Sequence, residues 1–532
     1  MNRKTLVLPT VVGLLAPVLV ACGGGDGAGK GKGAIVVGTT DRFEETTDAP
    51  APFDPAAAYD VGVWNVLHST FQTLLRLPRS GSEPAPDAAE RCGWSDRRNE
   101  QYRCTLRKGL TFSNGDELTV KDVKFSIERA RAINFENGPV SLLSNIDQVE
   151  TPNDREIVFQ LKAPDATFPQ KLATPAAAIV DAKAYPKDKL LTDGFKVVGS
   201  GPYTLETEEQ DNRVVKAVLT KNPDYKGSVT VQNDKVEMRF YDDARTMENA
   251  LKAGDIDVMN RTLAPEQIAK LRNSAGQQVK LLESPGHEIG YLAFNVDDPA
   301  VKPKAVRQAM AQLVDRQALA REGYDRTSDA LYSLVPSGIP GHQNSFANQY
   351  GGPSVDKARA LLKGAGISTP VRFTLAYSSD HYGEATARAF KTLQKQLNGS
   401  GLFDVKLQDV KWAEFRPNAA KGQYAVYGMG WFPDFPDPDN FIAPFFGKDN
   451  FLRSRYQNNK INDLIPRTRQ TSQRDSAARL FQQAQDIVAD EVPVLPLWQG
   501  KQYVATRTNV TGGEWVLNAA SELQPWELAR GK

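Results

Sequence analysis

An apolar run that stops at a cysteine constrains the start of this chain more than any other feature. Arg3 and Lys4 precede an apolar stretch over residues 6–20, and the stretch is followed at once by Cys22. A short basic segment, a brief apolar core and small residues before a cleavage site are the marks of a secretory signal. The stretch is also shorter than the roughly 20 residues that a membrane-spanning helix needs. We therefore predict that residues 1–22 are an export signal and take no part in the fold.

The end of this signal carries a second feature. Residues 19–22 read Leu-Val-Ala-Cys and resemble a bacterial lipobox, in which cleavage leaves the cysteine as a lipidated N-terminus. Residues 23–33 contain only Gly, Ala, Lys and Asp, a composition typical of a flexible coil. An ordinary cleaved signal with an incidental cysteine is the alternative. We predict a lipid on Cys22, a tether over 23–33, and a protein held on the outer face of the cell membrane or in the periplasm.

The cysteine count fits this prediction. If Cys22 carries lipid, Cys92 and Cys104 remain as a pair, and the oxidising environment outside the cell favours a disulfide between them. Residues 93–100 are polar and turn-forming, so a disulfide across a hairpin is expected. A cysteine-rich metal site would need further ligands close by, and the sequence offers none. We predict a structural disulfide and no bound metal.

The remaining chain is large and nearly neutral. Past residue 33 there are about 500 residues, enough for two or three hydrophobic cores. Removing the signal deletes two basic residues and moves the net charge from +1 to about −1, with the charges scattered along the chain. This balance argues against nucleic acid as a partner. No second apolar run is long enough to cross a membrane, so we expect the membrane to be reached through the lipid anchor alone.

Strand-like and helix-like patterns alternate along the body, which predicts the α/β class. One helix is expected to start at Thr119, because Asp122 three residues later completes a capping-box pattern. Apolar residues at helical spacing predict two further helices, and β-branched residues in short runs predict strands. These helices are expected over about 304–321 and 244–253, the latter ending at Gly254, and the strands over 34–39, 236–241 and 371–377.

Sequence signatures of catalysis are missing. The four histidines, His68, His287, His342 and His381, are far apart and never at a metal-binding spacing. No Gly-x-Ser-x-Gly elbow and no phosphate-binding Gly-rich loop are present. Carboxylates are abundant, as on any soluble surface, and no feature nominates a glycosidase pair. We predict that the protein is not an enzyme and holds no cofactor.

Five motif-like segments follow one another along the chain. They are Leu-Arg-Lys-Gly-Leu-Thr-Phe-Ser-Asn-Gly at 106–115 with the helix start at 118–126, Gly-Ser-Gly-Pro-Tyr at 199–203, Tyr-Leu-Ala-Phe-Asn at 291–295 with 306–309 and 314–316, Leu-Val-Pro-Ser-Gly-Ile-Pro at 334–340, and Gly-Trp-Phe-Pro-Asp-Phe-Pro-Asp-Pro at 430–438. In this order they resemble the peptide-class (family 5) solute-binding proteins of ATP-driven importers. Any one of these segments can occur by chance, but five in the right order are specific.

The resemblance implies a type II periplasmic-binding-protein clamshell of the large three-subdomain variety, with ligand held between two lobes. It implies two hinge crossovers, near Gly290 and Leu497, and places the disulfide pair in the inserted subdomain, away from the ligand. The expected divisions are lobe I over 34–75, 197–287 and 498–532, the subdomain inserted in lobe I over 76–196, and lobe II over 288–497.

Asp434 is the main candidate for contact with ligand. In peptide-binding members of the family, an aspartate at the matching position pairs with the ligand's α-amino group, and Asp434 lies in the matching motif. The alternative is that Asp434 caps a turn in a Pro-rich loop. Small residues at Gly428 and Gly430 would let another backbone approach closely. Asp437, directly before a proline, is expected to fix the loop.

The other candidates are aromatic or lie beside this motif. Trp431 and Phe432 are candidates for the wall of a side-chain pocket, with core packing as the alternative for each. Met429 belongs to the same segment. Trp498, at the second predicted hinge, is a candidate for the edge of the ligand site, although core packing explains it better. Three further residues fall where the family's first lobe faces the ligand: Tyr59, Trp64 and His68.

Together these features predict a monomeric protein that captures a small solute and delivers it to a membrane permease. The ATPase of that importer would be a separate chain. The family also contains binders of nickel chelates, sugars and opines, so a non-peptide cargo is the first alternative to a peptide. A surface-displayed hydrolase and a signalling or chaperone role are the others. Turnover by the purified protein would indicate a hydrolase, whereas unchanged peptide uptake in a deletion strain would count against transport.

Overall fold

The structure of this protein is a computed structural model that describes residues 33–531, except 262, 274–277, 449, 451 and 454. The predicted export signal, the lipidated Cys22 and the tether up to residue 32 lie outside the described residues. In the part of the chain that is described, no helix is long and apolar enough to cross a membrane.

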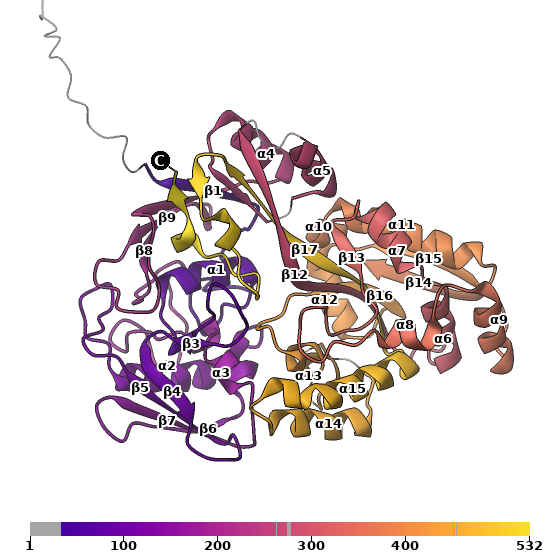
Figure 1. The fold of residues 1–532 in the computed structure, drawn as a ribbon, viewed down its shortest axis with the longest axis horizontal. Helices are drawn as coiled ribbons and strands as arrows, with labels where there is room; N and C mark the ends of the chain where they lie inside the picture. Colours follow the sequence, from indigo (N-terminus) through magenta and orange to yellow (C-terminus); the bar gives the residue numbers. More distant parts are fainter. Residues whose placement is uncertain are drawn as a thin grey trace, which may run out of the picture. The chain divides into compact units, whose positions relative to one another are not determined.

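An eleven-stranded mixed sheet forms the centre of the fold (Figure 1). Its order is β15-β14-β16-β12-β17-β11-β1-β10-β9-β8, and β13 pairs with β17. β1 runs parallel to β10 and β11, and β14 runs parallel to β15 and β16. The strands are β1 (Ile35–Thr39), β8 (Tyr203–Gln210), β9 (Arg213–Lys221), β10 (Lys235–Phe240), β11 (Val258–Asn260), β12 (Val279–Phe294), β13 (Ser328–Ala330), β14 (Val371–Tyr377), β15 (Phe403–Asp409), β16 (Val426–Trp431) and β17 (Val494–Arg507). The expected strands 34–39, 236–241 and 371–377 are confirmed.

Two long strands of this sheet, β12 and β17, connect two hydrophobic cores. The two strands lie side by side (Figure 1) and pair antiparallel along most of their length. Their register shifts between Pro285 and Ile289 and again between Gly290 and Tyr291. The first core is built from residues 35–258 and 504–528, together with Phe435, whereas the second is built from residues 289–497. Both predicted hinges lie on this strand pair. The division into lobes at the expected boundaries, and the bending of the hinges, stay predictions.

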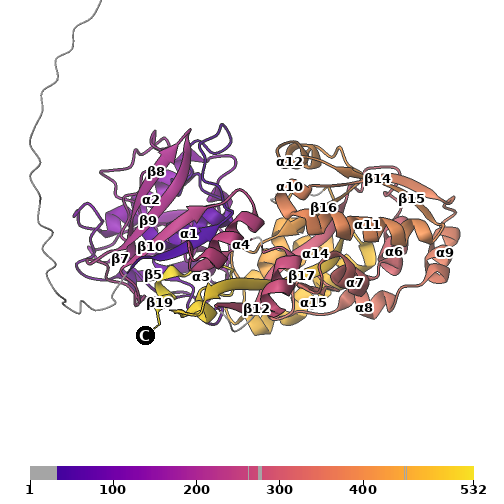
Figure 2. The same ribbon diagram turned by 90° about the horizontal axis from the view of Figure 1, so that it is seen from above.

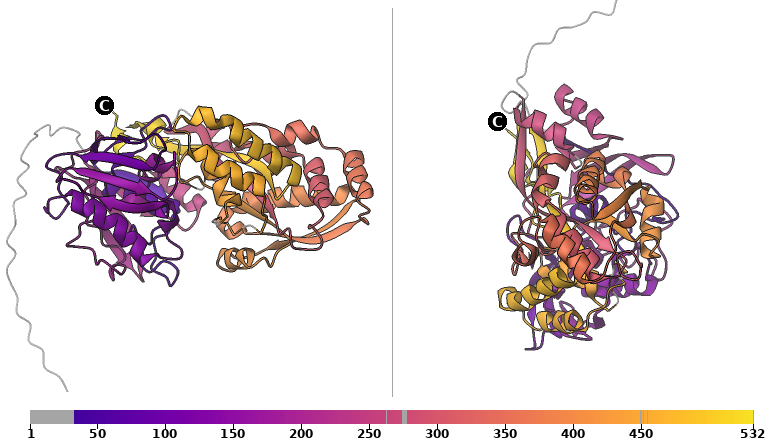
Figure 3. Two further views of the ribbon diagram at one scale, coloured as in Figure 1. Left: turned by 90° about the horizontal axis from the view of Figure 1, so that it is seen from below. Right: turned by 90° about the vertical axis from the view of Figure 1, so that its right-hand side faces the viewer.

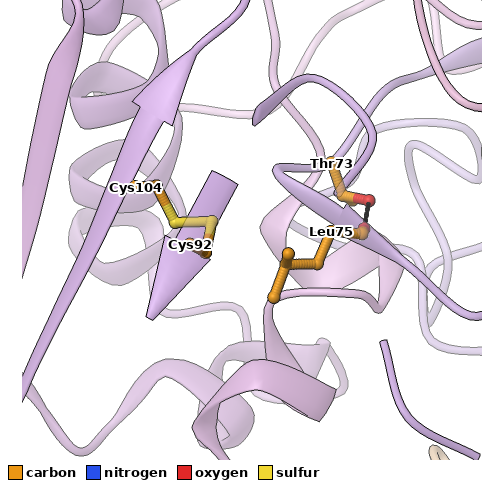
Figure 4. The surroundings of a disulfide bond; sticks show 4 residues. All are labelled: Thr73, Leu75, Cys92 and Cys104. Atoms are coloured by element: carbon orange, nitrogen blue, oxygen red, sulfur yellow. Dashed lines mark hydrogen bonds between the residues drawn. A yellow bond between two sulfur atoms is a disulfide. The ribbon is translucent and has the colours of Figure 1, made fainter. Parts of the chain in front are cut away.

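A smaller antiparallel sheet carries the disulfide. Its order is β4-β5-β7-β6, and α2 (Val120–Ile133) packs against β7 (Figure 3, left). Cys92 and Cys104 lie directly opposite each other on β4 and β5, with the sulfur atoms 2.03 Å apart (Figure 4). Asp96 in the hairpin loop accepts hydrogen bonds from the backbone N–H groups of Glu100 and Gln101. The predicted disulfide across a hairpin is confirmed. The strands are β4 (Ala89–Trp94), β5 (Gln101–Leu106), β6 (Ile146–Glu150) and β7 (Glu156–Leu161).

The predicted helix starts and stops are confirmed at two sites and wrong at a third. Thr119 and Asp122 form the capping box of α2, and α4 (Ala244–Ala253) ends at Gly254 in the left-handed conformation. The helix expected over 304–321, however, ends as α6 (Lys304–Leu313). Val314 is extended there, with φ −69° and ψ 112°, and Asp315 caps the next short helix by accepting the Ala318 N–H. The apolar pattern continues past Leu313, but the capping site at Asp315 ends one helix and starts another.

The other helices cover the sheet and its edges; for example, α11 lies against β15 and α6 packs against α9 (Figure 2). Their bounds are α1 (Val61–Thr70), α3 (Phe168–Lys171), α5 (Pro265–Asn273), α7 (Arg316–Ala318), α8 (Ser345–Tyr350), α9 (Val355–Gly364), α10 (Ser379–Tyr382), α11 (Glu384–Gly399), α12 (Trp412–Ala420), α13 (Ala443–Phe446), α14 (Asn459–Arg469) and α15 (Ala478–Glu491). The remaining short strands are β2 (Leu75–Arg76), β3 (Ala85–Pro86), β18 (Val510–Thr511) and β19 (Ala529–Arg530).

Candidate ligand site

Asp434 lies in the loop after β16, and its carboxylate joins two distant parts of the chain. The Tyr59 hydroxyl, from the segment before α1, donates a hydrogen bond to Asp434 Oδ1 over 3.0 Å. Asn440 Nδ2 donates to Oδ2 over 3.0 Å, while the Asp434 N–H donates to Asn440 Oδ1 over 2.9 Å. From the described part of the chain, each carboxylate oxygen therefore accepts one hydrogen bond and keeps capacity for another donor.

The surroundings of Asp434 disfavour the ionised form of its carboxyl group. Burial raises the pKa of this half-buried carboxyl to about 6, although the hydrogen bonds from Asn440 and Tyr59 oppose the rise. Burial also raises the pKa of Tyr59 well above its usual value, and the neighbouring Asp434 charge adds to the effect. Tyr59 therefore stays a hydrogen-bond donor at any physiological pH, and Asp434 favours a cationic partner that would stabilise its ionised form.

The loop that presents Asp434 is held rigidly by its neighbours. Asp437 accepts the Asp439 N–H over 2.8 Å and forms a two-point ion pair with Arg474, with N–O distances of 2.6 and 2.9 Å. Asp437 is 2% exposed, and Phe435 is 1% exposed within the first core. The expectation that Asp437 fixes the loop is confirmed. Asp434 is thus followed directly by Phe435, which is buried in the first core, and then by Asp437, which is held by Arg474.

The two glycines of β16 face aromatic rings of the protein itself. A Cβ on Gly428 would lie 2.0 Å from Cζ of Phe390, and one on Gly430 would lie 2.9 Å from Cε1 of Tyr382. The sequence suggested that these glycines leave room for a ligand backbone. In the structure, the space they leave is filled by the two rings, so side chains of α10 and α11 require the small residues at these positions.

A second polar group lies beside Phe432. The guanidinium of Arg261 sits over the Phe432 ring, 5.6 Å from its centre, and makes an ion pair of 3.1 Å with Asp41. Glu288 on β12 lies near the same arginine, and burial raises its pKa to about 7 against the influence of Arg261. Phe432 therefore borders a charged neighbourhood rather than the apolar core.

Three further candidates from the sequence, Trp431, Trp498 and Met429, lie in or beside packed parts of the protein. Trp431 is 7% exposed and donates from Nε1 to the Asn440 carbonyl over 2.9 Å, a contact typical of the core. Trp498 packs on Tyr324, with ring centres 4.9 Å apart, and its ring closely approaches Gly290. Met429 is half-buried beside the second core. Among the described residues, neither Trp498 nor Met429 forms a hydrogen bond with Asp434.

In the first core, Trp64 and His68 pack behind Tyr59 and do not extend to Asp434 as Tyr59 does. Trp64 is 7% exposed, donates to the Ala58 carbonyl, and places its ring 5.5 Å from that of Tyr59. His68 is buried and lies 2.8 Å from Glu522 in the C-terminal segment. The structure thus brings Tyr59 to Asp434 and leaves Trp64 and His68 in the packing behind.

Sequence reasoning missed Asn440, Arg261, Glu288 and Tyr382. Asn440 follows Asp434 by six residues and lies two positions past the end of the motif, so its nearness in sequence was a usable signal. Arg261 had none, because it lies in a short loop after β11 with a positive φ of 64°. Among the described residues, no group of three or more His, Cys, Asp or Glu is placed to hold a metal ion.

The family described as "Bacterial extracellular solute-binding proteins, family 5 Middle" matches residues 83–452, which is more than half of the chain. The chain belongs to this family. Family 5 proteins are the solute-binding components of ABC transporters and work outside the cytoplasm without catalysing a reaction. The predicted recognition and the predicted lack of enzymatic activity are confirmed.

Individual relatives agree with the family assignment. The probable D,D-dipeptide-binding periplasmic protein DdpA of Escherichia coli K12 is 27% identical over 478 residues, which cover 87% of this chain and 89% of the relative. The structure of DppA from Helicobacter pylori in complex with the peptide STSA has a TM-score of 0.79 at 22% identity, over 94% of this chain and 98% of that chain. AgaA of A. tumefaciens R10, in complex with agropinic acid, has a TM-score of 0.74 at 24% identity, over 93% and 96%. The periplasmic-binding-protein fold is confirmed.

Proposed function

We propose that this family 5 protein captures peptides and that Asp434 pairs with their α-ammonium group. The observation that carries the proposal is the half-buried Asp434 carboxylate, whose oxygens are oriented by Tyr59 and Asn440 and still have capacity for a further donor. A charge-assisted bond to such a carboxylate contributes about 1.5–3 kcal/mol. Several relatives with dipeptides or peptides in their names support the same cargo.

Transport follows from capture. In the proposed cycle, a peptide contacts both lobes, which the β12–β17 strand pair connects. The peptide binds the closed form more tightly than the open form and so favours closure. The closed form then docks on a membrane permease. The permease works with an ATPase on a separate chain, and the binding protein acts as a monomer. A lipid on Cys22 would keep it at the membrane; replacing Cys22 with Ser should then release the protein from the membrane fraction, and unchanged retention would contradict the anchor.

The α-ammonium is the group to test. Calorimetry would compare di-, tri- and tetra-alanine with their N-acetylated forms, which lack the positive charge but keep the rest of the backbone. In the wild type, we expect acetylation to weaken the affinity of the best ligand about 10- to 150-fold, which corresponds to the 1.5–3 kcal/mol of the charge-assisted bond. In Asp434→Asn the free and acetylated peptides should bind with similar affinity, because the carboxylate that distinguishes them is gone.

A result in which acetylation has the same effect in Asp434→Asn as in the wild type would contradict the assignment of Asp434. A non-peptide solute is the second candidate function, since a relative of the same fold was solved with agropinic acid. Failure of every peptide to bind, together with binding of a sugar, opine or metal chelate, would favour that candidate.

A further inference from the structure

Glu288 occupies a defined position beside the proposed peptide site. On the paired strands, Ile289 lies opposite Trp431 and Gly290 lies opposite Gly430, so Glu288 comes level with Phe432, just past the end of β16. Because side chains alternate along a strand, Glu288 and Gly430 share one face of the sheet. A Cβ on Gly430 would lie 3.6 Å from Glu288 Oε1, and a Cβ on Gly500 would lie 3.2 Å from Oε2. Two glycines therefore make room for this carboxylate.

The carboxylate has this room but no partner. Across the described ranges of the chain, half-buried Glu288 makes no hydrogen bond and no ion pair. The positive charge of Arg261 acts on Glu288 and lowers its pKa, but the ion pair that Arg261 forms is with Asp41, at 3.1 Å. The other titratable groups facing Glu288 are the hydroxyls of Tyr382 and Tyr324, whose pKa values are raised by burial, so neither supplies a positive charge.

A half-buried carboxylate that accepts no hydrogen bond from the protein is less stable in its ionised form than one in water, and a cation from outside the protein would stabilise it. The surrounding rings suit such a cation. Tyr382 reaches the same glycine as Glu288 does, and Phe432 already carries one guanidinium above its ring. Aromatic faces attract ammonium and guanidinium groups and also pack against the apolar stems of lysine and arginine.

We propose that Glu288 is the counter-ion for a cationic side chain of the bound peptide, so that this protein prefers peptides containing lysine or arginine. The inference rests on the proposed peptide function and adds a specificity-determining residue to it. Asp434 recognises a group that every free peptide has, whereas Glu288 selects among peptides by one side chain. The two carboxylates thus have separable roles.

The test uses alanine tripeptides that carry either lysine or norleucine at each position in turn. Norleucine keeps the unbranched apolar stem and lacks the ammonium group. We expect the purified wild-type protein to bind the lysine peptide about tenfold more tightly than the norleucine peptide at one position. Glu288→Gln should reduce that ratio to near one, because the amide keeps the shape of the side chain and lacks its charge. Glu283→Gln, the same change on the same strand where the side chain pairs with Arg272 and Lys501, should keep the wild-type ratio.

The pH dependence of the ratio gives a second readout that does not depend on a variant folding. Burial raises the pKa of Glu288 to about 7, so the carboxylate is increasingly protonated below that pH. The lysine-to-norleucine affinity ratio should fall by roughly fivefold from pH 8 to pH 6, and effects of Asp434 cancel because both peptides have the same α-ammonium.

Three results would overturn the inference. The first is a ratio near one in the wild type at every position, and the second is a ratio that Glu288→Gln leaves unchanged. The third is a pH-independent ratio. In each case binding of the alanine peptides would continue, so the proposed peptide function would stand. If none of the peptides binds, the proposed function fails and this inference fails with it.

Discussion

The pH dependence of peptide affinity follows directly from the surroundings of Asp434. Burial raises the pKa of its carboxyl from 3.8 to about 6. At about 1.4 kcal/mol per pKa unit, keeping the carboxylate ionised at neutral pH costs the folded protein about 3 kcal/mol. Because the folded pKa is the higher one, this cost is absent below pH about 4 and fully present above pH about 6. A peptide ammonium binds the ionised form and offsets part of that cost.

The affinity for an uncharged-side-chain peptide should therefore be constant above pH 6. Below it, the affinity should fall by up to tenfold for each pH unit, since a proton and the ammonium group compete for Asp434. Calorimetry with tri-alanine between pH 4.5 and 8 measures this curve. Asp434→Asn should bind weakly and without the transition, because its amide does not titrate in this range.

Tyr59→Phe gives the sharper version of this test. The Tyr59 hydroxyl donates over 3.0 Å to Asp434 and opposes the rise of its pKa. A hydrogen bond to a charged group contributes about 1.5–3 kcal/mol, so its loss should raise the midpoint of the affinity curve by about one unit or more. An unchanged midpoint in Tyr59→Phe, or a transition that persists in Asp434→Asn, would refute the reasoning.

Two stability predictions complete the set. Replacing Cys92 and Cys104 with Ser opens a loop closed across 12 positions of sequence and should lower the free energy of unfolding by about 3 kcal/mol, measured by chemical denaturation; the unreduced wild type, unfolded, should show neither thiol as free. Asp54→Ala removes a buried two-point ion pair with Arg129, with N–O distances of 2.7 and 2.6 Å, and should cost about 3–5 kcal/mol. The control Asp242→Ala, whose side chain is 72% exposed, should change stability by less than about 0.5 kcal/mol, and equal losses in the two variants would contradict the argument.

The predictable parts of the fold are those specified by neighbouring residues. Thr119 and Asp122 are three positions apart, and their side chains meet the helix start that they cap. The pairing of Cys92 with Cys104 follows from a short polar loop between two strands. The end of α6 at Leu313 was not predictable from the apolar pattern, because the alternative cap at Asp315 competes with a helix that the pattern allows to continue.

The candidate site was predictable only where a motif marked it. Asp434 stood out through its motif, and the structure brings Tyr59 to it from 375 positions away. Arg261 directly follows β11, whereas Glu288 lies within β12, and neither belongs to a recognisable pattern. Trp431 belongs to the same motif and is 7% exposed, so membership of the motif does not by itself distinguish the wall of a pocket from core packing. Whether a residue can contact a ligand depends on what the fold brings close together, and residue type alone does not show this.

The most direct test of the account is native mass spectrometry of the protein as it is purified, followed by denaturation and sequencing of any released molecule. The account predicts short peptides that are absent from Asp434→Ala and enriched in lysine or arginine. Release of a sugar, an opine or a metal chelate, or peptides that remain bound in equal amount to Asp434→Ala, would contradict it.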